Sequence, residues 1–591
     1  MLAPAENAVT ITTWLADFES ALAESDEILL GTLFHRDSHW RDVLALTWSF
    51  KTINGRDAIV NEFCKLDGVQ PTSFRLAMNR APPRYVSRAA VRSLEAIFTF
   101  ETVEGRCNGV LRLTREADDS SATKAWTLLT ALDEIKESEG QLENPPPKGD
   151  PPSRSFRGPN WLDRRKTAAA YAEHDPAVLV VGGGQAGLSA AACLRQLGVD
   201  TLIVDREARI GDNWRKRYHA LVLHNQTHVN HLPYLKFPAS WPTYLPKDKV
   251  AGWFEAYAES MELNLWTGTE FVGGTYDEEN GRWSVMVRRS DGSEREMHPR
   301  HVVMATGESG IPNLPDIPTL HNFAGSVLHS SQYQTGESWR GKNVLVIGTG
   351  TSGHDVAQDL HANGASVTLV QRSPTMVVNV EPGAQLPYEL YEEGPSLEDC
   401  DLIATSMPFS VAKRSHTLMT RQAKRLDRHL LEGLESRGFR LDFGEDETGW
   451  QFKYLTRGGG YYFNVGCSDL IVSGEVGLIQ FSDIANFVAE GACMRGGQCV
   501  EADLIVLATG YKGQEHLVSK LFGNEVAARV GPIWGFGDGE ELRNMYTSTA
   551  QSGLWFIAGS FAQCRIYSKY LGLNIKARET SLVKHEHHKL L

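Results

Sequence analysis

Three glycines, Gly182, Gly184 and Gly187, follow the aliphatic run Val178–Val181 in the spacing G-x-G-x-x-G. Small helix-forming residues come next, so the segment is typical of a strand, a tight turn and a helix start. Such glycines let the backbone approach a pyrophosphate, whose charge is stabilised at the helix N-terminus. Asp205 ends the next predicted strand, where a carboxylate accepts hydrogen bonds from ribose hydroxyls. The pattern predicts a dinucleotide site built from Gly182, Gly184, Gln185, Ala186, Gly187 and Asp205.

A second turn of the same kind contains Gly348, Gly350 and Gly353 in the same spacing. The strand after this second turn ends in Gln-Arg-Ser. Arg372 stands there in the place that Asp205 has after the first turn. An arginine there pairs with a 2′-phosphate and favours NADPH, although an ordinary loop cation stays an alternative. The two unequal strand ends favour FAD at the first turn and NADPH at the second. The ligands predicted at the second turn are Gly348, Gly350, Thr351, Ser352, Gly353 and Arg372.

Further cofactor contacts are predicted near the ends of other strands, because ligands of open α/β sheets lie at the carboxyl ends of strands. Trp214 and Arg215, in RIGDNWRKRY, are expected to cover the adenine–pyrophosphate half of a dinucleotide, with loop packing and a surface charge as the alternative. Two strands run into Ala-Thr-Gly turns. The cofactor-binding residues predicted there are Ala305, Thr306, Gly307, Thr509, Gly510 and Tyr511.

His224, His228 and His231 have helical spacing, but prolines lie close and no cysteine or carboxylate completes a ligand set. A polar loop that lines a cofactor or substrate pocket is favoured over a metal site, and no metal is predicted. The net charge of −14 disfavours nucleic acid as a partner.

The eight cysteines show no C-x-x-C pair, which disfavours a zinc ribbon or redox disulfide and favours a reducing, cytoplasmic location. The acidic N-terminus lacks the pattern of a signal peptide, and no apolar run is long enough to span a membrane.

At 591 residues the chain exceeds one hydrophobic core, so several domains are expected. Residues 1–140 predict helices followed by antiparallel strands, an α+β unit. There Asp37, His39 and Asp42 are candidate acid–base residues, although a scaffold or dimerisation module is favoured. Residues 141–164 are a proline-rich linker. The remaining boundaries predicted are 165–335 for the first part of the FAD domain, 336–500 for the NADPH domain with a substrate-loop insertion, and 501–591 for the second FAD part.

Between the two glycine turns, Phe323, Gly325, His329 and Tyr333 have the spacing F-x-G-x-x-x-H-x-x-x-Y. This resembles the signature of the class B flavoprotein monooxygenases, and the ending Tyr-Gln is similar to the flavin-containing monooxygenases rather than the Baeyer–Villiger enzymes. The segments LVLHNQTHVNHLPYLKFP, WPTYLPKDKVAGWFEAYA and ATGY resemble the YUCCA branch. The run LFHRDSHWRDVLALTWSFKTINGRDAI resembles the NTF2-like (SnoaL-like) fold. The expected fold is therefore α/β, with two dinucleotide-binding Rossmann-like domains preceded by an α+β NTF2-like cone.

The resemblance implies an NADPH- and FAD-dependent monooxygenase that inserts one oxygen atom from O2 into a small organic substrate through a C4a-(hydro)peroxyflavin. The reaction would be N- or S-oxygenation, or oxidative decarboxylation of a 2-oxo acid. The family's flavin-facing Asn maps to Asn225, and the implied catalytic residues are Asn225 and Gln226, which would hydrogen-bond around the flavin edge. His329 and Tyr333 are implied to couple the two domains. Open alternatives are an FAD/NADPH oxidase or reductase, a flavin-binding scaffold with a partner module, and a cone that is itself an isomerase or cyclase. NTF2-like modules often pair, so a homodimer is expected.

Overall fold

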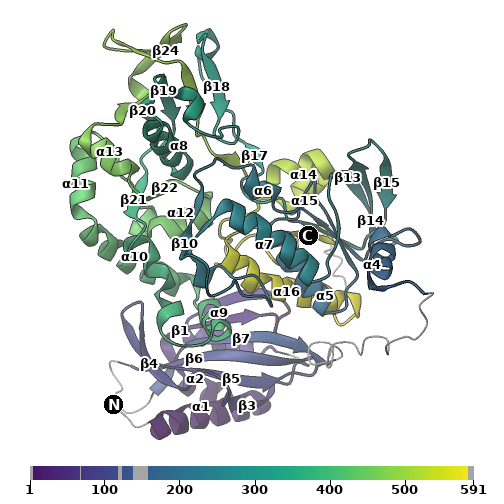
Figure 1. The fold of residues 1–591 in the computed structure, drawn as a ribbon. Helices are drawn as coiled ribbons and strands as arrows, with labels where there is room; N and C mark the ends of the chain where they lie inside the picture. Colours follow the sequence, from purple (N-terminus) through teal and green to yellow (C-terminus); the bar gives the residue numbers. More distant parts are fainter. Residues whose placement is uncertain (1–3, 67, 117–122, 137–157, 584–591) are drawn as a thin grey trace.

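The computed structural model describes residues 4–66, 68–116, 123–136 and 158–583 (Figure 1). The N-terminal unit places three helices on one face of a mostly antiparallel sheet with strand order β2-β1-β7-β6-β5-β3, and β4 pairs with β5. Phe18 of α1 packs against Phe34, Phe63 and Phe74, which anchors the helices to the sheet. The predicted combination of helices and antiparallel strands is confirmed, but the predicted order is not, because β1 and β2 precede α3. The likeness to the NTF2-like fold stays a prediction. The elements are α1 (Pro4–Glu24), α2 (Glu27–Leu33), β1 (Phe34–Val43), β2 (Phe50–Asn54), α3 (Arg56–Phe63), β3 (Thr72–Leu76), β4 (Arg84–Arg88), β5 (Val91–Glu101), β6 (Gly105–Arg115) and β7 (Thr123–Ile135).

The first glycine turn belongs to a parallel sheet with strand order β12-β9-β8-β16-β29. Its central strands are continuous aliphatic runs buried at every position, as expected where helices cover both faces of a sheet. Helices α5 and α16 pack against each other beside it, and a three-stranded antiparallel meander, β13–β15, follows β12. The elements are β8 (Val178–Val181), α5 (Gln185–Gln196), β9 (Thr201–Val204), α7 (Lys247–Ser260), β12 (Asn264–Trp266), β13 (Thr269–Asp277), β14 (Arg282–Arg289), β15 (Glu294–Met297), β16 (His301–Met304), β29 (Leu554–Phe556) and α16 (Phe561–Glu579).

The second glycine turn belongs to another parallel sheet, with order β18-β27-β19-β20-β23, and again a three-stranded meander follows, β24–β26. The predicted boundaries 336–500 are wrong, because β18 and β27 lie outside them and complete this sheet. Both β16 and β27 are short aliphatic strands ending in Ala-Thr-Gly, so the local sequence does not distinguish their sheets. The elements are β18 (Ser326–His329), β19 (Asn343–Ile347), α8 (Thr351–Ala362), β20 (Ser366–Gln371), β23 (Gly477–Gln480), β24 (Ile484–Val488), β25 (Gly491–Met494), β26 (Cys499–Glu501) and β27 (Leu504–Leu507).

A largely helical segment lies between the second sheet and the N-terminal unit (Figure 1). The predicted helical stretch Ser410–Leu434 is interrupted at Asp427, which separates α10 from α11. The segment comprises β21 (Met376–Asn379), the 3₁₀ helix η5 (Gly383–Glu392), α9 (Leu397–Thr405), α10 (Phe409–Leu426), α11 (Arg428–Ser436), α12 (Gly449–Arg457), β22 (Tyr461–Asn464) and α13 (Cys467–Ser473). Shorter elements elsewhere are α6 (Asp212–Arg215), β10 (Val222–Gln226), β11 (Tyr244–Pro246), β17 (Ile311–Pro312), β28 (Tyr511–Lys512), α14 (Glu515–Phe522) and α15 (Asn524–Val530).

Two further expectations from the sequence are corrected. Cys493 and Cys499 form a disulfide, because the antiparallel register of β25 and β26 sets them opposite each other. A search for C-x-x-C spacing does not detect cysteines that strand pairing brings together. The predicted linker 141–164 lies outside the described residues as far as 157, and helix α4 (Trp161–Ala170) already begins within it. Across the described ranges, no helix has the length and apolarity needed to cross a bilayer.

Candidate active site

The first glycine turn forms a close-packed cradle at the carboxyl end of β8. A Cβ on Gly182 would lie 2.5 Å from the carbonyl oxygen of Ala305, and one on Gly187 would lie 1.9 Å from the carbonyl oxygen of Gly182. The Asp205 carboxylate accepts hydrogen bonds from the backbone N–H groups of Gly183 (2.6 Å) and Glu207 (2.8 Å). The prediction that Gly182, Gly184, Gln185, Ala186, Gly187 and Asp205 share one site agrees with this arrangement, since all six lie at one edge of the sheet.

The second turn repeats this geometry in the other sheet. A Cβ on Gly348 would lie 2.3 Å from the carbonyl oxygen of Ala508, and one on Gly353 would lie 2.1 Å from the carbonyl oxygen of Gly348. Gly350 precedes α8, and the hydroxyl of Thr351 donates to the carbonyl oxygen of Tyr461 (3.1 Å). Ser352 follows in the first turn of the same helix. In each sheet, the alanine carbonyl of the Ala-Thr-Gly turn therefore packs against the first glycine of the neighbouring glycine turn.

Arg372 lies exposed directly after β20, where the sequence placed it. A second guanidinium, that of Arg440, donates to its carbonyl oxygen (2.6 Å). Buried Gln371 fixes Arg440 by accepting from its backbone N–H (2.8 Å) and donating to its carbonyl oxygen (2.9 Å). Two arginines therefore stand at this strand end, which strengthens its fit to a phosphate. Sequence reasoning missed Arg440, because no motif joins positions 68 residues apart.

Buried polar atoms in the first cradle fit a bound dinucleotide. The Trp214 indole N–H, the Thr306 hydroxyl, a Glu308 carboxylate oxygen and the Gln514 side-chain oxygen are buried, and none has a hydrogen-bond partner among the described residues. Burial raises the pKa of Glu308 to about 7, and the neighbouring carboxylate of Glu515 adds to that shift. Such groups cost free energy unless something pairs with them. Their presence beside the glycine cradle is therefore consistent with a polar cofactor such as FAD.

The other predicted cofactor residues lie in two places: Trp214 and Arg215 belong to α6, and Thr509 to Tyr511 follow a strand of the second sheet. Trp214 lies in α6 near Phe561, at the start of α16, whereas the Arg215 guanidinium is engaged by Asp212 (2.8 Å) and Glu255 (2.6 Å). Thr509, Gly510 and Tyr511 end β27 and so belong to the second sheet rather than the first. The Arg217 guanidinium contacts the Tyr511 hydroxyl at 3.3 Å, which links the two sheets.

The residues predicted for catalysis end strand β10. The Asn225 side chain donates to the hydroxyl of Tyr388 in η5 (3.0 Å), and the Asn225 carbonyl oxygen accepts from Asn230 (2.9 Å). Gln226 lines a cavity of about 250 Å³. The rest of that lining comes from the segment before and within η5, namely Glu381, Pro382, Gln385, Leu386, Tyr388, Glu389 and Glu392. Sequence reasoning left this segment without a role beyond a substrate entrance, since it carries no motif.

The signature residues between the turns hold parts of the molecule together. One His329 ring nitrogen contacts the carbonyl oxygen of Gly510 (3.1 Å), and the Tyr333 hydroxyl donates to Asp359 of α8 (2.5 Å). The next residue, Gln334, accepts from the backbone N–H of His219 in the first domain (2.8 Å). The partners of His329 and Tyr333 both belong to the second domain, and Gln334 makes the contact to the first, so the coupling role of His329 and Tyr333 stays a prediction.

The histidines of the β10 region do not converge on one point. His224 packs edge-on against Phe463, His231 accepts from the backbone N–H of Phe237 (2.9 Å), and His228 lies 3.9 Å from Glu392. Burial lowers the pKa of His231 to about 4. The part of the chain that the structure describes contains no group of three metal-ligating side chains.

In the N-terminal unit, Asp42 is an internal anchor. Its carboxylate accepts hydrogen bonds from the backbone of Leu46 and Thr47 and from the hydroxyls of Thr47 and Thr130, and burial raises its pKa to about 6. Asp37 and His39 lie 3.8 Å apart and contact α10 through Arg414 and Ser410 respectively. Asp42 therefore does not join these two as an acid–base set.

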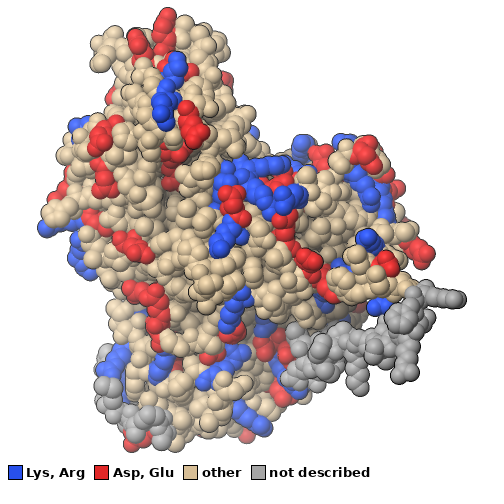
Figure 2. Space-filling view, in the orientation of Figure 1, with Lys and Arg blue, Asp and Glu red and all other residues tan. Residues whose placement is uncertain are grey.

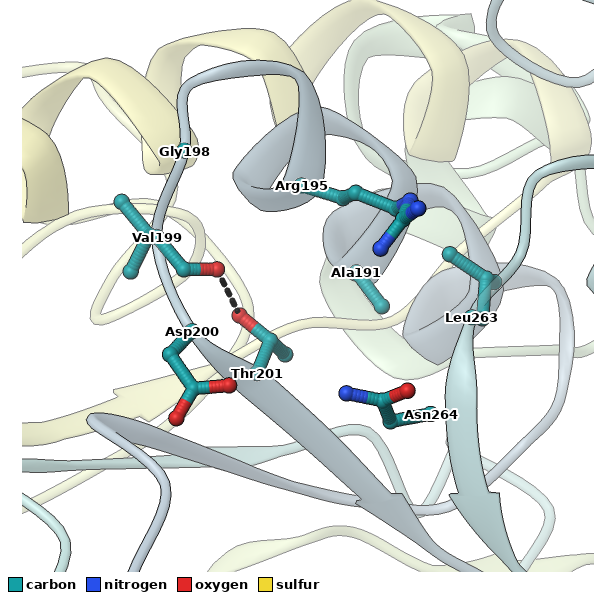
Figure 3. Close-up of a pocket in the computed structure, with 8 residues that line it drawn as sticks. All are labelled: Ala191, Arg195, Gly198, Val199, Asp200, Thr201, Leu263 and Asn264. Atoms are coloured by element: carbon teal, nitrogen blue, oxygen red, sulfur yellow. Dashed lines mark hydrogen bonds between the residues drawn. The ribbon is translucent and has the colours of Figure 1, made fainter. Parts of the chain in front are cut away.

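A second cavity, of about 240 Å³, lies away from both cradles (Figure 3). It is bounded by the end of α5 and by the first residues of β9 and β12, Thr201 and Asn264. This is the amino edge of the first sheet, opposite the edge at which α/β sheets bind ligands. The chemistry therefore belongs to the cradles and to the cavity beside Gln226.

Comparison with known proteins places this arrangement among described families. The family described as flavin-binding monooxygenase-like matches residues 176–514. The indole-3-pyruvate monooxygenase YUCCA1 of Oryza sativa subsp. japonica is 34% identical over 342 residues, 57% of this chain and 77% of that protein. The probable indole-3-pyruvate monooxygenase YUCCA10 of Arabidopsis thaliana is 30% identical over 338 residues, 57% and 81% of the two chains.

Two solved structures share the fold. Cyclohexanone monooxygenase with bound epsilon-caprolactone matches with a TM-score of 0.51 at 18% identity, over 69% of this chain and 89% of that one. Oxidised steroid monooxygenase bound to NADP matches with a TM-score of 0.50 at 18% identity, over 69% and 85%. At these identities the likeness concerns the fold alone.

Proposed function

The chain belongs to the flavin-binding monooxygenase-like family, and from that premise we propose that it oxygenates the nitrogen of a small organic amine. The cofactors are FAD and NADPH, and the co-substrate is O2. Bound FAD would supply the redox chemistry, namely hydride acceptance from NADPH and activation of O2. The net reaction converts amine, O2, NADPH and a proton to amine oxide, water and NADP⁺. The observation that carries the choice of an amine is the acidic lining of the cavity beside Gln226.

The chain's own residues hold the two dinucleotides in separate places. Gly182, Gly184 and Gly187 accommodate the FAD pyrophosphate, and Asp205 accepts from its ribose. At the second cradle, Arg372 and Arg440 neutralise the 2′-phosphate that distinguishes NADPH from NADH. Asn225 and Gln226 supply polar groups between the flavin and the substrate, and η5 excludes water from that space.

Three carboxylates line the cavity beside Gln226, those of Glu381, Glu389 and Glu392. No lysine or arginine stands among its described lining residues, so an ammonium group is attracted and a carboxylate is repelled. N-oxygenation needs the amine's free electron pair, so the ammonium must first lose its proton. Burial raises the pKa of Glu389, and the neighbouring Glu392 and Glu393 add to it, which suits this side chain to accept that proton.

A second candidate is the oxidative decarboxylation of a 2-oxo acid. It is favoured by the 34% identity to an indole-3-pyruvate monooxygenase. The acidic lining opposes it, because the carboxylate of a 2-oxo acid would face three like charges.

The test offers the FAD-loaded enzyme a tertiary amine, a thioether and indole-3-pyruvate, with product mass and H2O2 measured per NADPH consumed. The expected product is the amine oxide. In Glu389→Gln, KM for the amine rises about tenfold while KM for the uncharged thioether is unchanged. Decarboxylated product from indole-3-pyruvate with no amine oxide would establish the second candidate. H2O2 in stoichiometric yield with every substrate would identify an oxidase instead.

We further propose that the enzyme works in the cytoplasm as a homodimer. Six cysteines in the described part of the chain are unpaired, in support of a reducing compartment, although the Cys493–Cys499 disulfide argues against it. Fractionation of the host cell with a tagged chain tests the location, and light scattering at micromolar protein tests the dimer. A monomer at all concentrations would contradict the latter.

A further inference from the structure

The N-terminal unit uses the sheet face opposite its helices to bind the rest of the chain. That face packs on α9, α10 and α16 (Figure 1). The fully buried Arg112 donates to the hydroxyl of Ser406 at the end of α9 (2.9 Å), and Lys569 of α16 pairs with Asp133 of β7. Because the rest of the chain covers this sheet face, the face is not open to a separate substrate. The role of the N-terminal unit therefore lies in the elements that it contacts.

Most ion pairs across the contact set an arginine of the N-terminal unit against a carboxylate of the oxygenase part, whereas Lys569–Asp133 and Arg414–Asp37 have the opposite polarity. Glu393, directly after η5, accepts from both Arg84 (2.8 Å) and Arg88 (2.8 Å). Asp399 of α9 accepts from Arg80 (3.0 Å) and from the backbone N–H of Ala81 (2.9 Å). Figure 2 shows both signs of charge interspersed over the visible face, with no single large charged patch.

Another arginine, Arg41, contacts the far end of α9. Arg41 makes two hydrogen bonds to the carboxylate of Glu541 (2.8 and 2.6 Å) and donates to the carbonyl oxygen of Thr405 (2.6 Å), the last residue of α9. A guanidinium at a helix C-terminus also stabilises the helix dipole. Helix α9 is thus held at both ends by the N-terminal unit.

The segment held in this way forms one wall of the cavity beside Gln226. Within η5, Tyr388 accepts from Asn225 (3.0 Å), and Gln385 donates to the carbonyl oxygen of His224 (3.1 Å). Glu393, the clamped residue, is the C-cap of the same η5. The wall therefore has one set of contacts to β10 and another to the N-terminal unit.

Helix α9 likewise contacts both the N-terminal unit and the β10 region. Asp401 binds the Arg565 guanidinium of α16 through both oxygens (2.7 Å each). Arg565 in turn donates to the carbonyl oxygens of Val229 (2.8 Å) and His231 (2.8 Å), next to β10. Asp399 and Asp401, two positions apart, thus connect the N-terminal unit to the β10 region.

We propose that the N-terminal unit is an intramolecular clamp that holds η5 and α9 against β10 and thereby sets the shape of the substrate cavity. Arg80, Arg84 and Arg88 are positioning residues, since they act through Asp399 and Glu393 and touch no reacting atom. The inference rests on the proposed function for the identity of the cavity. The position of η5 can be measured without it.

The test compares Glu393→Gln with Glu398→Gln in the full-length, FAD-loaded protein. Both changes remove one carboxylate from the same segment, but Glu398 pairs with Lys236 of the oxygenase part and not with the N-terminal unit. The readouts are amide hydrogen exchange over residues 383–405, KM and kcat for substrate, and H2O2 released per NADPH.

In Glu393→Gln we expect exchange over 383–405 to rise about tenfold, because the charge-assisted bonds from Arg84 and Arg88 are lost. KM for substrate and H2O2 release rise, while FAD content and the rate of flavin reduction stay unchanged, and Glu393→Asp restores part of the parent's behaviour. Glu398→Gln leaves the exchange unaltered. Equal exchange in Glu393→Gln and the parent, or equal rises in both glutamine variants, would overturn the clamp. If the parent transfers no oxygen, the exchange comparison still decides, so failure of the proposed function is seen separately.

Discussion

The two sheets that carry the glycine turns share one architecture and differ in the residues at their strand ends. Each has a glycine turn after its central strand, a three-stranded meander, and a strand ending in Ala-Thr-Gly against the first glycine. The hypothetical Cβ clashes match closely, at 2.5 and 1.9 Å in the first sheet and 2.3 and 2.1 Å in the second. The shared geometry accommodates a pyrophosphate in either sheet and does not choose the nucleotide.

The choice is made by residues at the strand ends. Asp205 follows β9, whereas Arg372, with Arg440 beside it, follows β20. After the Ala-Thr-Gly turns, the first sheet has half-buried Glu308 and the second has Tyr511. We therefore propose that a common backbone with different side chains at the strand ends separates a ribose site from a phosphate site.

The largest expected effect comes from adding one methyl group to a glycine of either cradle, which should affect a different cofactor in each case. In Gly187→Ala the new Cβ meets the Gly182 carbonyl oxygen, so the protein is purified without FAD. In Gly353→Ala the clash is at Gly348, so FAD is retained while NADPH binding falls about 100-fold or more. Flavin absorbance and NADPH titration measure the two.

The control for this pair is Gly252→Ala in α7, where a Cβ meets nothing within 4 Å. It should leave both cofactors bound. Loss of FAD in Gly353→Ala with retention in Gly187→Ala would reverse the assignment of the two sheets.

The next effect sharpens the contrast between strand ends. Arg372→Gln should raise KM for NADPH about 100-fold and Arg440→Gln about tenfold, because each removes a charged partner of the 2′-phosphate. KM for NADH should stay constant in both, since NADH has no such phosphate. Steady-state kinetics with the two nucleotides provides the measurement, and a parallel rise for NADH would show that the arginines serve the fold instead.

The smallest effect concerns Glu308, the carboxyl without a counterpart in the second sheet. Its pKa is raised from 4.5 to about 7, so the unfolded chain ionises first and the folded state loses stability as pH rises through this window. Glu308→Gln removes that loss. Relative to the parent, the variant's free energy of unfolding should increase by about 2 kcal/mol between about pH 4.5 and about pH 8, in FAD-free protein.

Urea unfolding at several pH values measures this difference. The exposed Glu279→Gln is the control and should show no pH-dependent change relative to the parent. A constant difference between Glu308→Gln and the parent across the range would contradict a buried protonated carboxyl.

The sequence predicted the parts of the site that depend on neighbours along the chain. The glycine turns, Asp205 and Arg372 stand where strand, turn and helix signals placed them, because these signals lie within one βα unit. The assignment of Thr509–Tyr511 to the first domain failed, since β16 and β27 carry the same local pattern and only pairing with β8 or β19 tells them apart.

Contacts made across the fold were out of reach for the same physical reason. Tyr388 meets Asn225 across 163 positions, and Arg41 meets Glu541 across 500. Cys493 and Cys499 are close in sequence, but strand register rather than spacing pairs them. None of these leaves a periodicity in the sequence, because each depends on the packing of separate elements.

The most direct test of the account is the fate of molecular oxygen. The FAD-loaded enzyme is supplied with NADPH, ¹⁸O2 and the best amine substrate, and product mass is followed against NADPH consumed. The account predicts one ¹⁸O atom in each amine oxide and about one product per NADPH. Unlabelled product, or H2O2 equal to the NADPH consumed with every substrate offered, would contradict a monooxygenase.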